Sequence, residues 1–140
     1  MLLPKKVKFR KWQKNRTNRS KVGVETRGTK LSFGAYGLKA EDGARIRSIH
    51  IESARKAMAK ELKKAGKVWI RIFPDRPFTA KAAEVGMGKG KGDPQGYEVI
   101  VKPGRVLFEL DGVDEAVARL TLRKAADKLP LHTRIVTRTI

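Results

Sequence analysis

Cysteine is absent from this chain of 140 residues. Its absence excludes disulfides, thiolate nucleophiles and cysteine-ligated zinc or iron–sulfur sites. The two histidines, His50 and His132, lie far apart and outside any metal-ligand spacing. We therefore predict no metal site and no cofactor.

Long apolar runs are also missing. No stretch approaches the roughly 18 apolar residues that a membrane-spanning helix requires. The first segment, MLLPKKVKFRKWQKNR, is basic and lacks the apolar centre of a secretory signal. Secretion is disfavoured, whereas composition alone leaves an organellar transit peptide open.

Acidic residues are scarce beside basic ones. The chain has 14 Asp and Glu against 33 Lys and Arg, a formal charge of +19. This excess is far larger than solubility requires and predicts a polyanionic partner. The expected helices carry mixed charge rather than one basic amphipathic face, which favours nucleic acid over an anionic membrane.

Residues 1–30 predict a basic arm, because Glu25 is the only acidic residue among its many cations. Such a block of like charge should be disordered in isolation and become ordered when phosphates neutralise it. Phe9 and Trp12 lie among the cations and could stack on bases, although a solvated tail stays the alternative. The predicted rRNA contacts of the arm are Lys5, Lys6, Lys8, Arg10, Lys11, Trp12, Lys14, Arg16 and Arg19.

Residues 31–140 predict one globular α+β domain, since hydrophobic residues, 40% of the chain, suffice for a modest core. Helical periodicity covers 48–65, ended by Gly66, and a second helix starts near 114 and stops before Pro130. The stretch 31–40 predicts a short strand or hairpin, and alternating patterns predict strands at 67–73, 97–101, 105–110 and 133–140, with a turn at 74–77.

The basic outer face of helix 48–65 has two interpretations. It could be simply solvated, or it could lie along a phosphate backbone, and Arg55 is its predicted rRNA contact. Arg71 on strand 67–73 is a further predicted contact, whereas the neighbouring Trp69 is expected to cover the sheet.

The glycine loop GMGKGKG, residues 86–92, separates two predicted strands. A P-loop needs a hydroxyl residue after Gly-Lys and a helix that follows, and both are missing here. Asp111, Asp114 and Glu115 cluster where they would cap a helix. We therefore predict no enzyme. The alternatives are a basic nucleotide-dependent enzyme that uses the glycine loop, or a DNA-architectural protein.

Two motifs are especially specific, namely GKVWIRIFPD and MGKGKG at residues 87–92. With the other segments they resemble, nearly end to end, the bacterial-type large-subunit ribosomal protein L-sixteen family. Those segments are MLLPKKVKFRK, SFGAYGLKA, IESARKAMA, KPGRVLFELDGV, AVARL and KLPLHTRIVTRT. Gly86 departs from the arginine that many members have there, and Arg47 replaces the usual threonine, so we expect Ser48 to cap the first helix.

The resemblance implies an α+β fold with a hammerhead-like β arrangement and a structural role in the large ribosomal subunit. It implies binding to rRNA near the peptidyl-transferase centre, proximity to A-site tRNA with P-site tRNA left open, and help with subunit assembly and tRNA accommodation. Neighbouring large-subunit proteins are further implied partners, with no membrane and no small-molecule substrate. The implied location is a cytoplasmic ribosome, with an organellar one left open. The implied rRNA- and tRNA-proximal loop is Met87, Gly88, Lys89, Gly90, Lys91 and Gly92.

Overall fold

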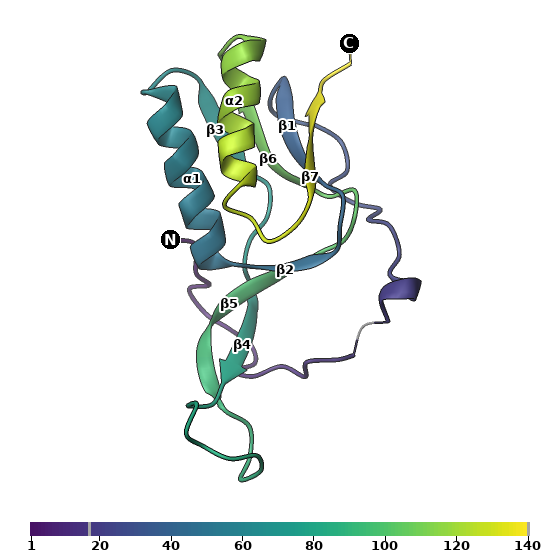
Figure 1. Cartoon of the computed structure of the whole chain (residues 1–140), viewed down its shortest axis with the longest axis vertical. Coiled ribbons are helices and arrows are strands. Elements are labelled where there is room, and N and C mark those ends of the chain that lie inside the picture. The colour runs from purple at the N-terminus through teal and green to yellow at the C-terminus, as the bar shows by residue number, and fades with distance from the viewer. Residues whose placement is uncertain (17, 140) are drawn as a thin grey trace.

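The computed structural model describes residues 1–16 and 18–139, without the side chain of Arg19 (Figure 1). This part of the chain contains two α-helices, one short 3₁₀ turn, η1 (Arg19–Lys21), and seven strands in two antiparallel sheets. The predicted α+β class is confirmed.

The larger sheet and the two helices form the core. The sheet has the order β3 (Lys67–Ile70), β6 (Val106–Asp111), β1 (Tyr36–Ala40) and β7 (Thr133–Thr137). Helices α1 (Ser48–Leu62) and α2 (Glu115–Ala126) lie side by side against it (Figure 1). Their apolar stripes are buried with the central strand β6, whose Phe108 is fully enclosed. Burial of these stripes supplies the main stabilisation of the fold.

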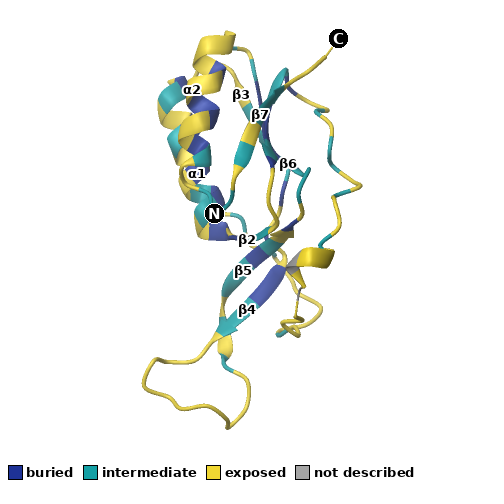
Figure 2. Ribbon diagram, turned by 45° about the vertical axis from the view of Figure 1, so that its right-hand side comes forward, coloured by how far each residue is buried: buried dark blue, intermediate teal, exposed yellow. Residues whose placement is uncertain are grey.

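The smaller sheet carries the glycine loop away from this core. It has the order β2 (Ala44–Arg47), β5 (Asp93–Val101) and β4 (Arg76–Ala80). Strands β4 and β5 form a hairpin that projects from the helical part, and residues 81–92 connect them at its tip (Figures 1 and 2). The connection is exposed throughout residues 81–91. The predicted loop between two strands is confirmed.

The strand or hairpin predicted at 31–40 is wrong in its first half. Strand β1 begins only at Tyr36, and a further strand, β2, follows it unpredicted. The backbone N–H groups of Ser32, Phe33 and Gly34 donate to the side chain of Glu109, not to a neighbouring strand. A buried carboxylate thus replaces the sheet ladder as the acceptor for these donors.

Helix α1 ends three residues before the predicted end at 65. Lys63 and Lys64 adopt left-handed conformations, and Gly66 does so as well. The chain must reverse there, because Lys67 pairs with Asp111 at the start of β3. The prediction that Ser48 caps the helix is wrong, since Ser48 is already its first residue. The N–H of Arg47 instead donates to Nδ1 of His50 at 3.2 Å.

Residues around the predicted turn 74–77 also differ from the prediction. Strand β3 ends at Ile70, although the N–H of Arg71 still donates to the Leu107 carbonyl. Pro77 lies inside β4, which is tolerated because β4 is an edge strand and needs no donor on its outer side. Strand β5 starts at Asp93, four residues before the predicted strand 97–101, because it pairs along β4.

The C-terminal predictions hold more closely. The side chain of Asp114 caps α2 by accepting the N–H of Val117, as expected for a carboxylate at this place. Helix α2 itself ends at Ala126, short of the predicted limit before Pro130. The closing strand is β7, and Ile140 lies outside the described residues.

Candidate nucleic-acid interface

The arm is joined to the glycine loop by two reciprocal contacts. Nζ of Lys11 donates to the carbonyl of Lys91 at 3.3 Å, and Nζ of Lys91 donates to the carbonyl of Trp12. The two residues are 80 positions apart in the sequence. We call this pair of contacts the clasp; it brings the basic arm to the root of the loop.

Two arginines of the smaller sheet fix the next part of the arm. Arg76, only 6% exposed, donates from Nη2 to the carbonyls of Gln13 and Lys14 at 2.7 and 3.0 Å. Arg45 donates to the Lys14 carbonyl as well, at 2.9 Å. A guanidinium that donates to backbone carbonyls makes charge-assisted bonds. Residues 11–14 are therefore ordered against the sheet by the protein itself.

A basic cleft of about 540 Å³ lies where the arm meets the smaller sheet. Five of its lining side chains are cationic and one is a carboxylate, a formal charge of +4. We call it the arm–hairpin cleft. Its charged and aromatic lining residues are Trp12, Lys14, Arg45, Arg47, Arg76, Phe78, Lys91 and Glu98.

Sheet pairing explains why positive charge collects in this cleft. Glu98, at the middle of β5, is paired with Arg47 of β2 and with Arg76 of β4. Arg45 lies 3.8 Å from the Glu98 carboxylate. One buried carboxylate thus faces three arginines, and a net positive charge remains.

Sequence patterns alone did not indicate the three arginines of this cleft or Phe78 as candidate site residues. Arg45 and Arg47 flank the buried Ile46 in the short alternating stretch ARIR, a signal that could have revealed a strand. Arg76 lies within PDRP, which was interpreted as a turn. Proline and aspartate suggested a turn more strongly than the edge strand that forms.

The C-terminal end of the arm, at Lys30, is held by Arg71, which forms a buried ion pair. Nη1 of Arg71 lies 2.6 Å from the carboxylate of Glu109, which is fully buried. Arg71 also donates to the carbonyl of Lys30 and lies over the ring of Phe33. Burial alone would raise the pKa of Glu109, but backbone donors at residues 32–34 and Arg71 outweigh burial and lower the pKa.

Arg55 lies away from the clasp on α1. Arg55 forms an ion pair with Glu52 at 2.5 Å, and the Arg55 guanidinium lowers the pKa of Glu52 to about 2.

Trp69 stacks on Phe33 with ring centroids 5.9 Å apart, as expected for a residue that covers the sheet.

The other predicted contacts of the arm lie in its exposed parts. Lys11 is half-buried by the clasp and Trp12 is 44% exposed. The side chain of Arg19 lies outside the described residues. The exposed cations are Lys5, Lys6, Lys8, Arg10, Lys14 and Arg16.

The tip of the loop has a left-handed backbone. Gly88, Lys89 and Gly90 have φ of 94°, 60° and 91°, and Lys81 donates from Nζ to the carbonyl of Gly88. Met87 is fully exposed at this tip. After the tip the chain enters β5, a strand, so the helix N-terminus that a P-loop uses to bind phosphate is missing at this site.

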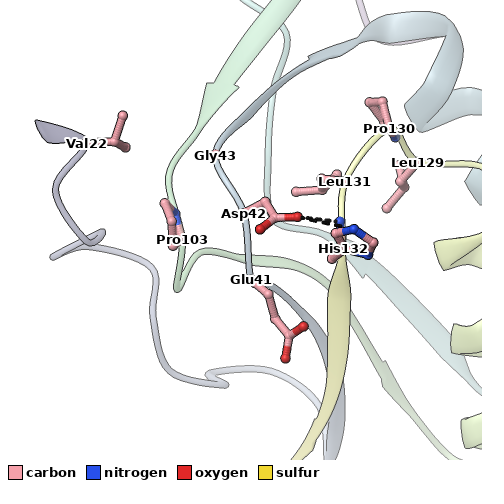
Figure 3. A pocket seen from close by; sticks show the side chains of 9 residues that line it. All are labelled: Val22, Glu41, Asp42, Gly43, Pro103, Leu129, Pro130, Leu131 and His132. Atoms are coloured by element: carbon pink, nitrogen blue, oxygen red, sulfur yellow. Dashed lines mark hydrogen bonds and ion pairs between the residues drawn. The ribbon is translucent and has the colours of Figure 1, made fainter. Parts of the chain in front are cut away.

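A larger cleft, about 770 Å³, has the opposite character (Figure 3). Glu41 and Asp42 line it beside apolar residues of the α2–β7 connection. Asp42 accepts the backbone N–H of His132 at 3.2 Å. Two carboxylates would repel a phosphate, so charge selects the smaller arm–hairpin cleft for nucleic acid.

In the described chain, no helix is long and apolar enough to span a membrane. Among the same residues, no group of three or more histidine and carboxylate side chains is arranged to hold a metal ion.

A comparison with known protein families matches residues 4–136 to the family described as ribosomal protein L16p/L10e. The match covers nearly all of the chain.

Proposed function

Because the chain belongs to the ribosomal protein L16p/L10e family, and is thus a structural constituent of the large ribosomal subunit, we propose that its arm and glycine loop together form the RNA-binding surface. Membership also makes rRNA and other ribosomal components its partners and assigns it a structural rather than an enzymatic role. The finer proposal places this surface in rRNA near the peptidyl-transferase centre of a cytoplasmic ribosome.

The clasp is the observation that supports the proposal best. By joining residues 11–12 to Lys91, it unites two cationic segments that lie 80 positions apart in the sequence. The cations Lys8 and Arg10 of the arm and Lys89 of the loop are exposed, and the hairpin that carries the loop projects from the rest of the fold (Figure 2). Such a surface matches the phosphate backbone of folded RNA by charge and shape.

Each part of this surface has a proposed role. The exposed arm cations neutralise rRNA phosphates and so dominate affinity. The loop tip, which is slim because of its glycines, approaches A-site tRNA and supports the accommodation of that tRNA. Binding of the arm to rRNA aids assembly of the subunit. Arg71 and Arg76 are occupied within the protein, so we assign both to positioning the arm.

Salt dependence of rRNA binding tests the role of the arm. We expect Lys5→Gln, Lys6→Gln and Lys8→Gln together to reduce the slope of log K against log salt by about 2, at about 0.7 per contact with unpaired RNA. The matched control is Arg119→Gln, Arg123→Gln and Lys128→Gln, which removes equal charge from exposed positions of α2 and the residues after it. Equal slopes in the two triple variants would overturn the proposal for the arm.

A further inference from the structure

The arm–hairpin cleft combines aromatic side chains with cations, whereas attraction of phosphates alone would need only cations. Its volume of about 540 Å³ lies within the range of about 300–1,000 Å³ for small-molecule sites. The larger cleft described above, with a volume of about 770 Å³, lies in that range too, so size alone does not identify a ligand. The residues that line the arm–hairpin cleft indicate what it binds.

The cations of this cleft divide into two groups. Arg76 and Arg45 already donate to carbonyls of the arm, and Arg45 also neutralises Glu98. Arg47 is exposed and lies across the strands from Glu98, but among the described residues it forms no ion pair; its guanidinium lies 4.5 Å from the ring centre of Phe78. Lys14 is exposed as well, and the exposed Lys91 donates to the Trp12 carbonyl without an acidic partner. In the described chain, no carboxylate neutralises the charge of these three side chains.

Trp12 supplies the aromatic surface. It lines the cleft, it is 44% exposed, and no other ring or cation of the described chain stacks on it. Its backbone carbonyl is held by Lys91, and the residues that follow it are held by Arg76. The backbone that carries the ring is therefore held in place, so less conformational entropy is lost when a flat partner stacks on the ring.

From this arrangement, and resting on the proposed function, we infer that the arm–hairpin cleft binds one unpaired nucleotide of RNA. The base stacks on Trp12, and Lys14, Arg47 and Lys91 hold the adjoining phosphates. A paired base cannot enter, because its faces are covered by its neighbours in the helix, whereas an unstacked base offers a free face to an aromatic side chain. Duplex RNA should therefore bind to other parts of the surface.

Tryptophan fluorescence of the full chain tests the inference. The Trp69→Phe background leaves Trp12 as the single tryptophan. Short oligoadenylate should quench it, while a blunt-ended, fully paired RNA duplex, inorganic polyphosphate and polyglutamate should not. The last two probes carry negative charge without bases, so they separate stacking from charge attraction.

Matched variants give the affinities. Trp12→Ala should weaken oligoadenylate binding about fivefold or more, and Trp12→Phe should restore most of it, because a smaller ring still stacks. Arg47→Gln should lower the salt slope by about 0.7. Arg123→Gln, an exposed arginine on α2, is the control and should leave affinity and quenching unchanged.

Unchanged affinity in Trp12→Ala would overturn the inference, as would equal quenching by polyphosphate or polyglutamate. Cosedimentation of the unaltered protein with large subunits separates this failure from that of the proposed function. Cosedimentation without quenching by oligoadenylate refutes the nucleotide site alone. Loss of cosedimentation refutes the proposed function itself.

Discussion

The Glu109→Gln substitution should destabilise the protein strongly. The Glu109 carboxylate has no solvent exposure and accepts four donors, namely Arg71 at 2.6 Å and the N–H groups of Ser32, Phe33 and Gly34 at 2.8–3.3 Å. Glutamine has nearly the same shape, but it removes the charge and can turn an NH₂ group toward Arg71. Breaking a buried pair from one side costs about 3–5 kcal/mol. That is a large part of the about 5–15 kcal/mol that stabilises a domain.

Urea unfolding at neutral pH measures this loss. The control is Glu115→Gln, which breaks an exposed i,i+4 pair with Arg119 on α2 and should cost about 0.5 kcal/mol. A loss below about 1 kcal/mol for Glu109→Gln, or equal losses for both variants, would refute the claim that this buried pair anchors the arm.

The same residue predicts a pH dependence. The pKa of Glu109 is lower in the folded protein than its ordinary value of 4.5. Its ionisation therefore stabilises the fold fully above pH 4.5, and this contribution is lost as the pH falls through the lower, folded pKa. We expect the difference in unfolding free energy between the unaltered protein and Glu109→Gln to shrink as the pH falls below 4.5. A difference that stays constant down to full acid unfolding would contradict the assignment.

Four further substitutions test the arm and the loop. Gly92→Ala should lower the melting temperature, because the new Cβ would lie 2.6 Å from a carbonyl oxygen of β4. Gly86→Arg should leave the melting temperature unchanged, because a Cβ at this position meets no heavy atom within 4 Å, and its added charge should steepen the salt slope of rRNA binding. A melting temperature lowered equally by both would be the contrary result. Arg76→Met should expose residues 11–14 to trypsin and to amide hydrogen exchange, while Arg123→Met on α2 should not. Unchanged protection would show that the bonds from Arg76 to the carbonyls of residues 13 and 14 do not hold the arm. Lys89→Ala should slow tRNA accommodation in reconstituted subunits while its effect on unfolding stays within about 0.5 kcal/mol, and equal accommodation would argue against the loop's role.

Several features of the fold follow from local sequence. The apolar stripes of α1 and α2, the cap at Asp114 and the alternation in β3 and β7 depend on neighbours a few positions apart, so the sequence alone predicted them. The excess of basic residues and the missing P-loop hydroxyl likewise need only the sequence. They indicated a nucleic-acid-binding protein and disfavoured phosphoryl-transfer chemistry.

Contacts between distant residues decided the rest. Glu109 accepts amide donors 75–77 positions away, so residues 32–34 form no strand although their pattern suggested one. Predictions for the arm show the same limit: charge repulsion argued for a disordered arm, yet residues 11–14 are fixed by Arg45, Arg76 and Lys91.

By itself, the sequence determined the charge, the main helices and most strands, and the presence of a glycine loop between two strands. Only the tertiary structure decided that the arm meets that loop and that arginines from β2 and β4 gather around Glu98. The physical reason is that strand register brings together side chains from remote segments, and no local pattern of residues records which strands will pair.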